Sequence, residues 1–150
     1  MPESVKSKII VAMPAYNEEK YIGSIVLAAK QYAGEVIVIN DGSNDQTSKI
    51  ASLAGATVID HEENKGYGSS IQAIIAEANK KKPDVLVIID ADGQHKSEEI
   101  PRLIKAVLEG NDLVIGSRKL QKDTSTPLYR RFGQKILLYL TNFQSGKKLT

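Results

Sequence analysis

The sequence predicts an α/β protein in which a mostly parallel β-sheet is covered by helices on both faces. Short, continuous apolar runs alternate with segments of helical apolar spacing along residues 8–143. Runs that are apolar throughout, rather than at every second residue, are typical of strands buried on both faces of a parallel sheet. A length of 150 residues supports one such core and leaves little room for a second, so one domain is predicted.

The first half of the chain begins this alternation. Residues 8–13, KIIVAM, are predicted to form a strand, and residues 18–32 a helix with an apolar residue every three or four positions. Residues 35–40, EVIVIN, are a second strand, after which the turn residues DGSND lead into a short helix over residues 46–53. A third strand is predicted at residues 57–59.

The second half continues in the same way. The elements predicted there are a helix at 67–79, a strand at 85–89, a helix at 98–109, a strand at 112–115 and a helix at 128–143. Ser97 is expected to cap the helix at 98–109, and Pro101 falls in its first turn, where proline is favoured.

Composition narrows the function classes. The chain has no cysteine, so disulfides and thiolate metal sites are excluded. No apolar run reaches the roughly 18 residues of a membrane span and no signal peptide is visible, so a cytoplasmic location is expected. Residues 118–150 are basic, with eight Lys or Arg and one acid, which favours contact with phosphates or an anionic surface. Nucleic acid is not expected as a partner, because no known binding motif accompanies this charge.

Polar clusters follow four of the predicted strands. They read PAYNEE, NDGSND, DADGQH and GSRK. In open α/β sheets, ligands bind outside the carboxyl ends of the strands, so these clusters predict one site at that edge. The chain has neither a GxGxxG motif nor a P-loop, so dinucleotide cofactors and ATP hydrolysis lack their usual signatures.

The cluster after residues 85–89 contains Asp90, Asp92 and Gln94. Residues two apart on an extended chain point the same way, so these side chains could present oxygens to one point if the strand geometry persists. Two neighbouring carboxylates repel each other, and a hard cation such as Mg²⁺ or Mn²⁺ relieves that repulsion and neutralises a diphosphate leaving group. The alternative is a helix-capping Asp beside a turn Asp.

The other clusters suggest contacts with a nucleotide. Asp41 could accept hydrogen bonds from uracil N3–H, or from guanine N1–H and its amine, so uridine and guanosine both stay open. Tyr16 could stack on a base or pack in the core, and Glu18 could accept from ribose hydroxyls or favour a helix N-terminus. The glycines of residues 64–70, NKGYGSS, could let backbone amides approach a phosphate or could only form a turn.

Taken in order, these motifs resemble a known family. MPAYNEEKYI, EVIVINDGSNDQT, NKGYGSSIQAI, VLVIIDADGQHKSEEIPRLI and DLVIGSR together closely resemble family 2 glycosyltransferases of the GT-A fold. The branch resembled includes dolichyl-phosphate mannose synthases and other polyprenyl-phosphate glycosyltransferases, over about residues 8–145. Asn40 departs from the pattern, since many relatives have a second Asp there, and this puts little in doubt.

The resemblance implies inverting transfer of a sugar from a UDP- or GDP-sugar with the help of Mg²⁺ or Mn²⁺. The residues that match nucleotide-binding positions are Pro14, Tyr16, Glu18, Asp41, Asp90, Ala91, Asp92 and Arg118. Asp90 and Asp92 match the metal motif, with Gln94 as an additional ligand, and His95 beside them is expected to be a spectator.

The resemblance also implies a polyprenyl (dolichyl) phosphate as the sugar acceptor. Such a phosphate is anionic and could attack without a general base, and no catalytic base is assigned. Relatives continue well past the equivalent of Thr150, so residues 1–150 are expected to be the donor-binding front part of a longer enzyme at the cytoplasmic face of the membrane.

The basic, amphipathic segment 128–148 could lie on the membrane interface, pack on the sheet or drive homodimer formation. Two alternative functions stay open. One is a non-catalytic fragment that binds a nucleotide sugar. The less expected one is a DxD-type phosphatase, whose motif would normally lie near the chain start.

Overall fold

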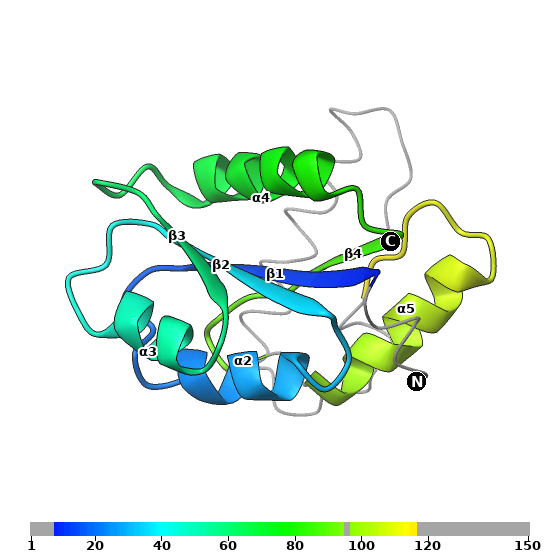
Figure 1. Cartoon of the computed structure of the whole chain (residues 1–150), viewed down its shortest axis with the longest axis horizontal. Helices are drawn as coiled ribbons and strands as arrows, with labels where there is room; N and C mark the ends of the chain where they lie inside the picture. Colours follow the sequence, from blue (N-terminus) through cyan, green and yellow to red (C-terminus); the bar gives the residue numbers. More distant parts are fainter. Residues whose placement is uncertain (1–7, 95–96, 117–150) are drawn as a thin grey trace, which may run out of the picture. The chain divides into compact units, whose positions relative to one another are not determined.

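A computed structural model describes residues 8–94 and 97–116 of the chain (Figure 1). Its sheet contains β1 (Ile9–Ala15), β2 (Glu35–Asn40), β3 (Thr57–Asp60) and β4 (Val85–Ile88). The spatial order is β3-β2-β1-β4, and every neighbouring pair is parallel. This confirms the predicted α/β class. Because the chain runs outward from β1 to β3 and then returns to the other side of β1, the strand order reverses between β1 and β4.

The helices cover both faces of this sheet, as predicted (Figure 1). One face carries α2 (Ile22–Ala29), α3 (Thr47–Leu53) and α5 (Ile100–Leu108), the last preceded by the 3₁₀ turn η1 (Ser97–Glu99). The opposite face carries α4 (Tyr67–Lys81).

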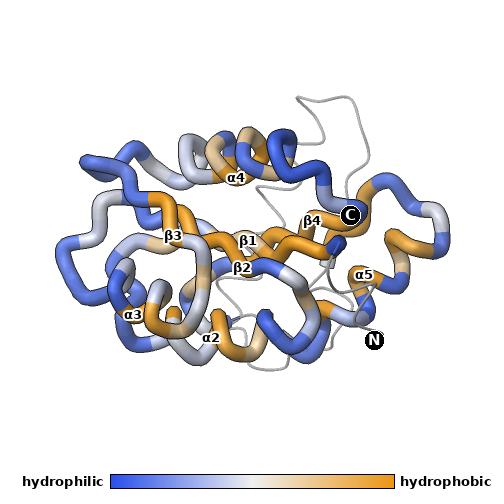
Figure 2. The backbone as a smooth tube through the Cα atoms, in the orientation of Figure 1, coloured by the Kyte–Doolittle hydropathy of each residue, from blue (hydrophilic) through white to orange (hydrophobic). Residues whose placement is uncertain are grey.

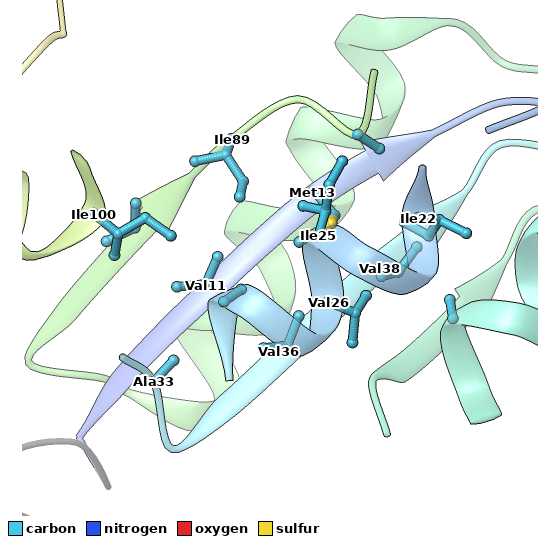
Figure 3. Packing of buried hydrophobic residues seen from close by; sticks show 14 of the residues in the cluster. Val11, Met13, Ile22, Ile25, Val26, Ala33, Val36, Val38, Ile89 and Ile100 are labelled. Atoms are coloured by element: carbon cyan, nitrogen blue, oxygen red, sulfur yellow. The ribbon is translucent and has the colours of Figure 1, made fainter. Parts of the chain in front are cut away.

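The core has two layers because successive strand residues point to opposite faces. Val11 and Met13 of β1 pack on the side of α2 and α5, together with Ile22 and Ile100 (Figure 3). Their neighbours Ile10 and Ala12 pack on the other side, against Ile74 of α4. Figure 2 shows the result, with mainly hydrophobic strands and mainly hydrophilic loops at their ends. Burial on both faces explains the continuous apolar runs.

The helix predicted at residues 18–32 is shorter in the structure, because its first turn serves another contact. The backbone N–H of Glu18 donates to the hydroxyl of Thr47 at 2.7 Å, which ties this segment to the start of α3. The segment from Glu18 to Tyr21 forms turns, and regular helix begins at Ile22.

Two local predictions are wrong. Residues 112–115 form no strand: their short apolar run is present, but Leu113 is 77% exposed, and β4 is the last strand of the sheet within residues 8–94 and 97–116. A strand needs a neighbour for its backbone hydrogen bonds, and an apolar run alone does not supply one. Ser97 does not cap α5, because it lies in the 3₁₀ turn η1, three residues before Ile100; Pro101 does occupy the first turn as expected.

Several predictions fall on residues that the structure does not describe. They are the helix at 128–143, the membrane or dimer contact of residues 128–148, and the positions of His95 and Arg118. In the part of the chain that is described, no helix has the length and apolar character to span a membrane.

Candidate functional site

A cavity of about 430 Å³ lies at the carboxyl edge of the sheet, where the strand order reverses. Its walls come from the end of β1, the loops after β2 and β4, and the start of α4. The lining residues are Pro14, Ala15, Tyr16, Glu18, Asp41, Asn64, Gly66, Tyr67, Ser70, Asp90, Ala91 and Asp92. The structure therefore brings together every predicted nucleotide-binding residue that it describes.

The cavity opens where β1 and β4 part. Their pairing ends at Ala12 and Ile88, and the last backbone contact runs from the N–H of Ile89 to the carbonyl of Ala12 at 3.1 Å. Alternation along β1 places the backbone nitrogen of Pro14 on the β4 side, since the carbonyl of Ala15 serves the β2 side. Proline has no N–H to donate, so the ladder to β4 cannot continue there.

Asp41, directly after β2, is a buried carboxylate of the cavity that accepts three hydrogen bonds. It is 4% exposed. Its Oδ1 accepts from Nδ1 of His61 at 2.7 Å and from the N–H of Lys65 at 3.0 Å, and its Oδ2 accepts from the N–H of Gly66 at 2.8 Å. Burial alone raises the pKa of Asp41, but these hydrogen bonds outweigh it and hold the pKa below its usual value. Asp41 is therefore an ionised acceptor at neutral pH.

His61 was missed by sequence reasoning, although the strand register predicts its position. β2 and β3 pair with Asn40 opposite Asp60, so the next residues, Asp41 and His61, lie side by side. The preceding pair is also joined, because Nδ2 of Asn40 donates to Oδ1 of Asp60 at 2.7 Å. A correct alignment of the two predicted strands would have revealed both contacts.

The loops after β1 and β2 are held together by reciprocal hydrogen bonds. The N–H of Asn17 donates to Oγ of Ser43 at 2.9 Å, and Oδ1 of Asn17 accepts from the N–H of Asn44 at 2.9 Å. Farther along, Oε2 of Glu19 accepts from the N–H of Gln46 at 3.0 Å. These contacts fix the loop after β1 relative to the loop that carries Asp41.

The structure decides between alternatives for two residues on this loop. Tyr16 is 44% exposed on the cavity wall, so the core interpretation is wrong and the stacking interpretation stays. Glu18 lines the cavity and lies outside the first turn of α2, which contains no acidic residue, while its backbone carbonyl accepts from the N–H of Ile22 at 2.9 Å. Burial, and then the negative charges of Asp92 and Asp45, raise the pKa of Glu18.

Asp90, Ala91 and Asp92 line the opposite end of the cavity, but not with the geometry expected of a continuing strand. β4 ends at Ile88, and the chain bends after Asp90, with a φ of +74° at Gly93. The Tyr67 hydroxyl donates to Oδ1 of Asp90 at 3.3 Å.

Asp92 forms the turn that was considered as its alternative role, because its Oδ1 accepts from the backbone N–H of Gln94 at 2.9 Å. Gln94 is not among the residues that line the cavity, and its assignment as a metal ligand stays a prediction.

The residues present fit a hard divalent cation whose remaining coordination positions are filled by water and by a bound phosphate. Within residues 8–94 and 97–116, no three His, Asp or Glu side chains form a ready metal cage. Asp90 and Asp92 do place two carboxylates on one wall, and Mg²⁺ commonly binds one or two carboxylates and takes its other ligands from water and phosphate. The pKa of Glu18 is raised mainly by burial and then by the negative charges of Asp92 and Asp45, and a cation beside Asp92 would offset that charge.

The loop of residues 64–70 contacts Asp41. The backbone N–H groups of Lys65 and Gly66 both donate to Asp41, and the phosphate interpretation of the other amides of this loop stays a prediction. Gly66 has a φ of +86° at the start of α4, which a residue with a side chain rarely adopts. Farther into this helix, Ser70 is fully buried and its hydroxyl has no hydrogen-bond partner.

Comparison with known proteins identifies the family. The family model described as glycosyl transferase family 2 matches residues 10–150. The chain belongs to glycosyltransferase family 2. The family match leaves the phosphatase alternative without support.

Two curated relatives act on lipid phosphates, by their names. An undecaprenyl-phosphate 4-deoxy-4-formamido-L-arabinose transferase from Photorhabdus laumondii is 32% identical and matches 98% of this chain and 47% of its own length. A UDP-N-acetylglucosamine–dolichyl-phosphate N-acetylglucosaminyltransferase from Methanococcus voltae is 30% identical and matches 95% and 65%. The chain thus spans only about half to two thirds of these family 2 glycosyltransferases.

A solved structure supports the GT-A fold. Glucosyl-3-phosphoglycerate synthase from Mycobacterium tuberculosis, in complex with Mn²⁺, UDP-glucose and phosphoglyceric acid, superimposes with a TM-score of 0.60 at 28% identity. The match covers 73% of this chain and 43% of that chain. The predicted GT-A architecture of this family 2 glycosyltransferase is therefore confirmed.

Proposed function

We propose that this chain binds the donor in an inverting glycosyltransferase reaction, in which a sugar moves from a UDP- or GDP-sugar to a polyprenyl phosphate. The observation that carries the proposal is the cavity at the β1–β4 junction. It places an ionised, hydrogen-bonded carboxylate, Asp41, at one end and the carboxylate pair Asp90 and Asp92 at the other. A nucleoside diphosphate has the matching polarity, with hydrogen-bond donors on its base and negative charge on its phosphates.

The nucleoside would lie against the loops after β1 and β2. Asp41 would accept from the base edge, Tyr16 would stack on the base, and Glu18 would accept from the ribose hydroxyls. Pro14 and Ala91 contribute the apolar parts of the wall. The hydrogen bonds between the loops after β1 and β2 hold these groups in place before the ligand arrives, which reduces the ordering cost of binding.

The diphosphate would lie beside Asp90 and Asp92, which would hold Mg²⁺ or Mn²⁺. When bound there, such a cation neutralises the diphosphate and makes it a better leaving group. The chain's own contribution is to keep the two carboxylates on one wall, with the Tyr67 hydroxyl donating to Asp90. Arg118 would add a positive charge near the phosphates.

A lipid phosphate suits the sugar-acceptor role because its oxygen is already deprotonated at neutral pH. Its attack forms a bond to the anomeric carbon as the bond from that carbon to the diphosphate breaks, with inversion at carbon and no proton to remove. The names of the two relatives, which specify undecaprenyl phosphate and dolichyl phosphate, support this acceptor class. Such a substrate would place the whole enzyme at the cytoplasmic face of the membrane.

A second candidate is a donor-binding fragment that does not turn over. It is favoured by the partial coverage of the relatives, 47% of one and 65% of the other. Binding of the nucleotide without sugar transfer would support this candidate.

Two measurements on the purified chain test the proposal, after circular dichroism has shown that it is folded. Calorimetric titration of UDP and GDP, each with Mn²⁺ and again with EDTA, should give metal-dependent binding of at least one nucleotide. Incubation with radiolabelled UDP- or GDP-sugars and a polyprenyl phosphate in detergent then tests transfer. If the folded chain binds neither nucleotide, the proposed donor site is wrong.

A further inference from the structure

The loop after β4, which carries Asp90 and Asp92, leaves the sheet just before these residues. The N–H of Ile89 still donates to the carbonyl of Ala12 at 3.1 Å. Within the loop, Oδ1 of Asp92 accepts from the N–H of Gln94 at 2.9 Å, a bond that shapes the loop but does not attach it to the sheet. Contacts from other elements are therefore needed to fix the two carboxylates in place.

Tyr21 makes such a contact at Gly93. A Cβ atom at Gly93 would lie 3.0 Å from Cδ1 and 3.2 Å from Cγ of Tyr21. These distances are shorter than the roughly 3.5–4.0 Å at which carbon atoms pack best, so the backbone of Gly93 lies directly against the ring. Gly93 also has a φ of +74°, so its conformation and its neighbour both favour glycine.

The backbone of Tyr21 is fixed at the start of α2. Its N–H donates to the carbonyl of Glu18 at 3.0 Å, and its own carbonyl accepts from the N–H of Ile25 at 3.1 Å and from the hydroxyl of Ser24 at 2.8 Å. The next residue, Ile22, is fully buried and anchors this end of α2 in the core. The ring therefore contacts the loop from a rigid element.

The Tyr21 side chain contributes little to the core or to the cavity wall. It is 48% exposed, and among the described residues it belongs neither to the two core layers nor to the cavity lining. Shortening this side chain should therefore leave the core packing intact, and its main consequence should fall on the loop at Gly93.

A second tyrosine contacts the same loop from the other face of the sheet. Tyr67, at the start of α4, donates from its hydroxyl to Oδ1 of Asp90 at 3.3 Å. Helices α2 and α4 cover opposite faces of the sheet (Figure 1). The loop after β4 is thus contacted by a ring from the α2 side and by a hydroxyl from the α4 side.

We propose that Tyr21 is a positioning residue for the cation and the diphosphate, because its ring restrains the loop after β4 so that Asp90 and Asp92 face the cavity before a ligand binds. This inference rests on the proposed function. Tyr21 would touch neither the cation nor the nucleotide and would act through Gly93. By ordering the loop in advance, it lowers the entropy cost of binding the cation.

The first test needs no ligand and measures the amide exchange rate of Gln94 by NMR in the folded chain. Tyr21→Ala should speed this exchange by at least about threefold, because the turn closed by Asp92 opens more often. Tyr21→Phe should leave the rate unchanged, since ring carbons make the contact. Leu27→Ala is the matched control, because it removes an exposed apolar side chain from the same helix.

Two outcomes of this exchange experiment would overturn the proposal. One is an unchanged rate for Gln94 in Tyr21→Ala. The other is an equal acceleration at core amides such as that of Val11, which would show a general loss of stability instead of a local restraint.

The second test measures the Mn²⁺ requirement of nucleotide binding, by calorimetric titration of UDP and GDP at several Mn²⁺ concentrations. Tyr21→Ala should raise the Mn²⁺ concentration for half-maximal binding by roughly threefold to tenfold, whereas Tyr21→Phe and Leu27→Ala should match the unchanged chain. An unchanged requirement in Tyr21→Ala, or an equal rise in Tyr21→Phe, overturns the role of the ring alone. If the unchanged chain binds neither nucleotide, the proposed function is wrong as well.

The third test is a double-mutant cycle that isolates the contact between Tyr21 and Gly93. Gly93→Ala adds a Cβ against the ring and should raise the Mn²⁺ requirement by at least about tenfold in the unchanged chain. In the Tyr21→Ala background it should raise the requirement less, because the ring is gone. The strain of the positive φ is present in both backgrounds and cancels. Fully additive effects would show that the two residues do not act through their contact.

Discussion

At the β2 end of the cavity, Asp41 is buried and accepts three hydrogen bonds, whereas at the β4 end Asp92 is half-buried and accepts one from a backbone N–H. The two ends also affect proton binding in opposite ways. The pKa of Asp41 is lowered, while the pKa of Glu18, beside Asp92, is raised by burial and then by neighbouring negative charge. At the Asp41 end, hydrogen bonds from the chain itself already stabilise the negative charge before a ligand binds. At the Asp92 end, the negative charge would be offset by a bound cation.

The largest effect on nucleotide binding is expected at the end of the cavity that contains Asp92. Asp92→Ala should weaken Mn²⁺-dependent nucleotide binding by at least about 100-fold, because it removes one of two carboxylates available for the cation. Calorimetry of UDP and GDP with Mn²⁺ measures this loss, and EDTA should reproduce it in the unchanged chain. If neither Asp92→Ala nor EDTA changes the nucleotide affinity, then Asp92 does not bind a cation that the nucleotide needs.

Substitution of Asp41, at the other end of the cavity, should affect the stability of the fold as well as nucleotide binding. Asp41→Asn replaces an acceptor-only group by one that must turn an N–H toward existing donors, which leaves at least one buried N–H poorly paired. We expect a loss of roughly 1–3 kcal/mol in the free energy of unfolding. Urea denaturation measures it, with Asp84→Asn as a control at an exposed carboxylate. A loss no larger than the control's would show that the network contributes little to the fold.

The pH dependence of stability should also separate the two ends. The unfolded Asp41 carboxyl titrates near 3.8, and its folded pKa is lower. The unfolded chain therefore binds more protons between these values, so the stabilisation by Asp41 is present above pH 3.8 and is lost as the pH falls through the folded pKa. The Tm difference between the unchanged chain and Asp41→Asn should shrink below about pH 4. A difference that stays constant to pH 2 would contradict the lowered pKa.

A smaller effect of opposite sign is expected for Glu18→Gln. Because the folded pKa of Glu18 is above 4.5, its ionised form is disfavoured in the folded state at neutral pH. Neutralising it should raise the Tm of the ligand-free chain slightly at pH 7, on the order of 1–2 °C. At pH 3 the carboxyl is protonated in both states and the two chains should unfold at similar temperatures. A lower Tm at pH 7 would mean that Glu18 makes a favourable contact there.

The sheet could be predicted from the sequence because its central strands β1 and β2 are buried on both faces and therefore read as continuous apolar runs. Residues such as Ile10 and Val11 serve opposite layers of the core, and both must be apolar. The failures occurred where distant contacts override local pattern. The N–H of Glu18 is held by the side chain of Thr47, so regular helix begins only at Ile22. Residues 112–115 have a strand-like apolar run without a neighbouring strand in the described part of the chain.

The candidate site was predictable in its residues but not in its hydrogen bonds. Pro14, Asp41 and Asp92 follow from motifs at strand ends, and they line one cavity. The partnership of Asp41 with His61 depends on the register between β2 and β3, which a motif does not carry. That the buried hydroxyl of Ser70 has no hydrogen-bond partner depends on the three-dimensional packing around it, which a motif does not carry.

Because β1 lies between β2 and β4, the sheet sets the distance between the two ends of the cavity. The strands that lead to Asp41 and to Asp90 lie two strand spacings apart, about 10 Å. Backbone hydrogen bonds set this length, so side-chain substitutions in the core leave it almost unchanged. Changes of base or metal preference can therefore arise at either end of the cavity without altering the span that a nucleoside diphosphate must cover.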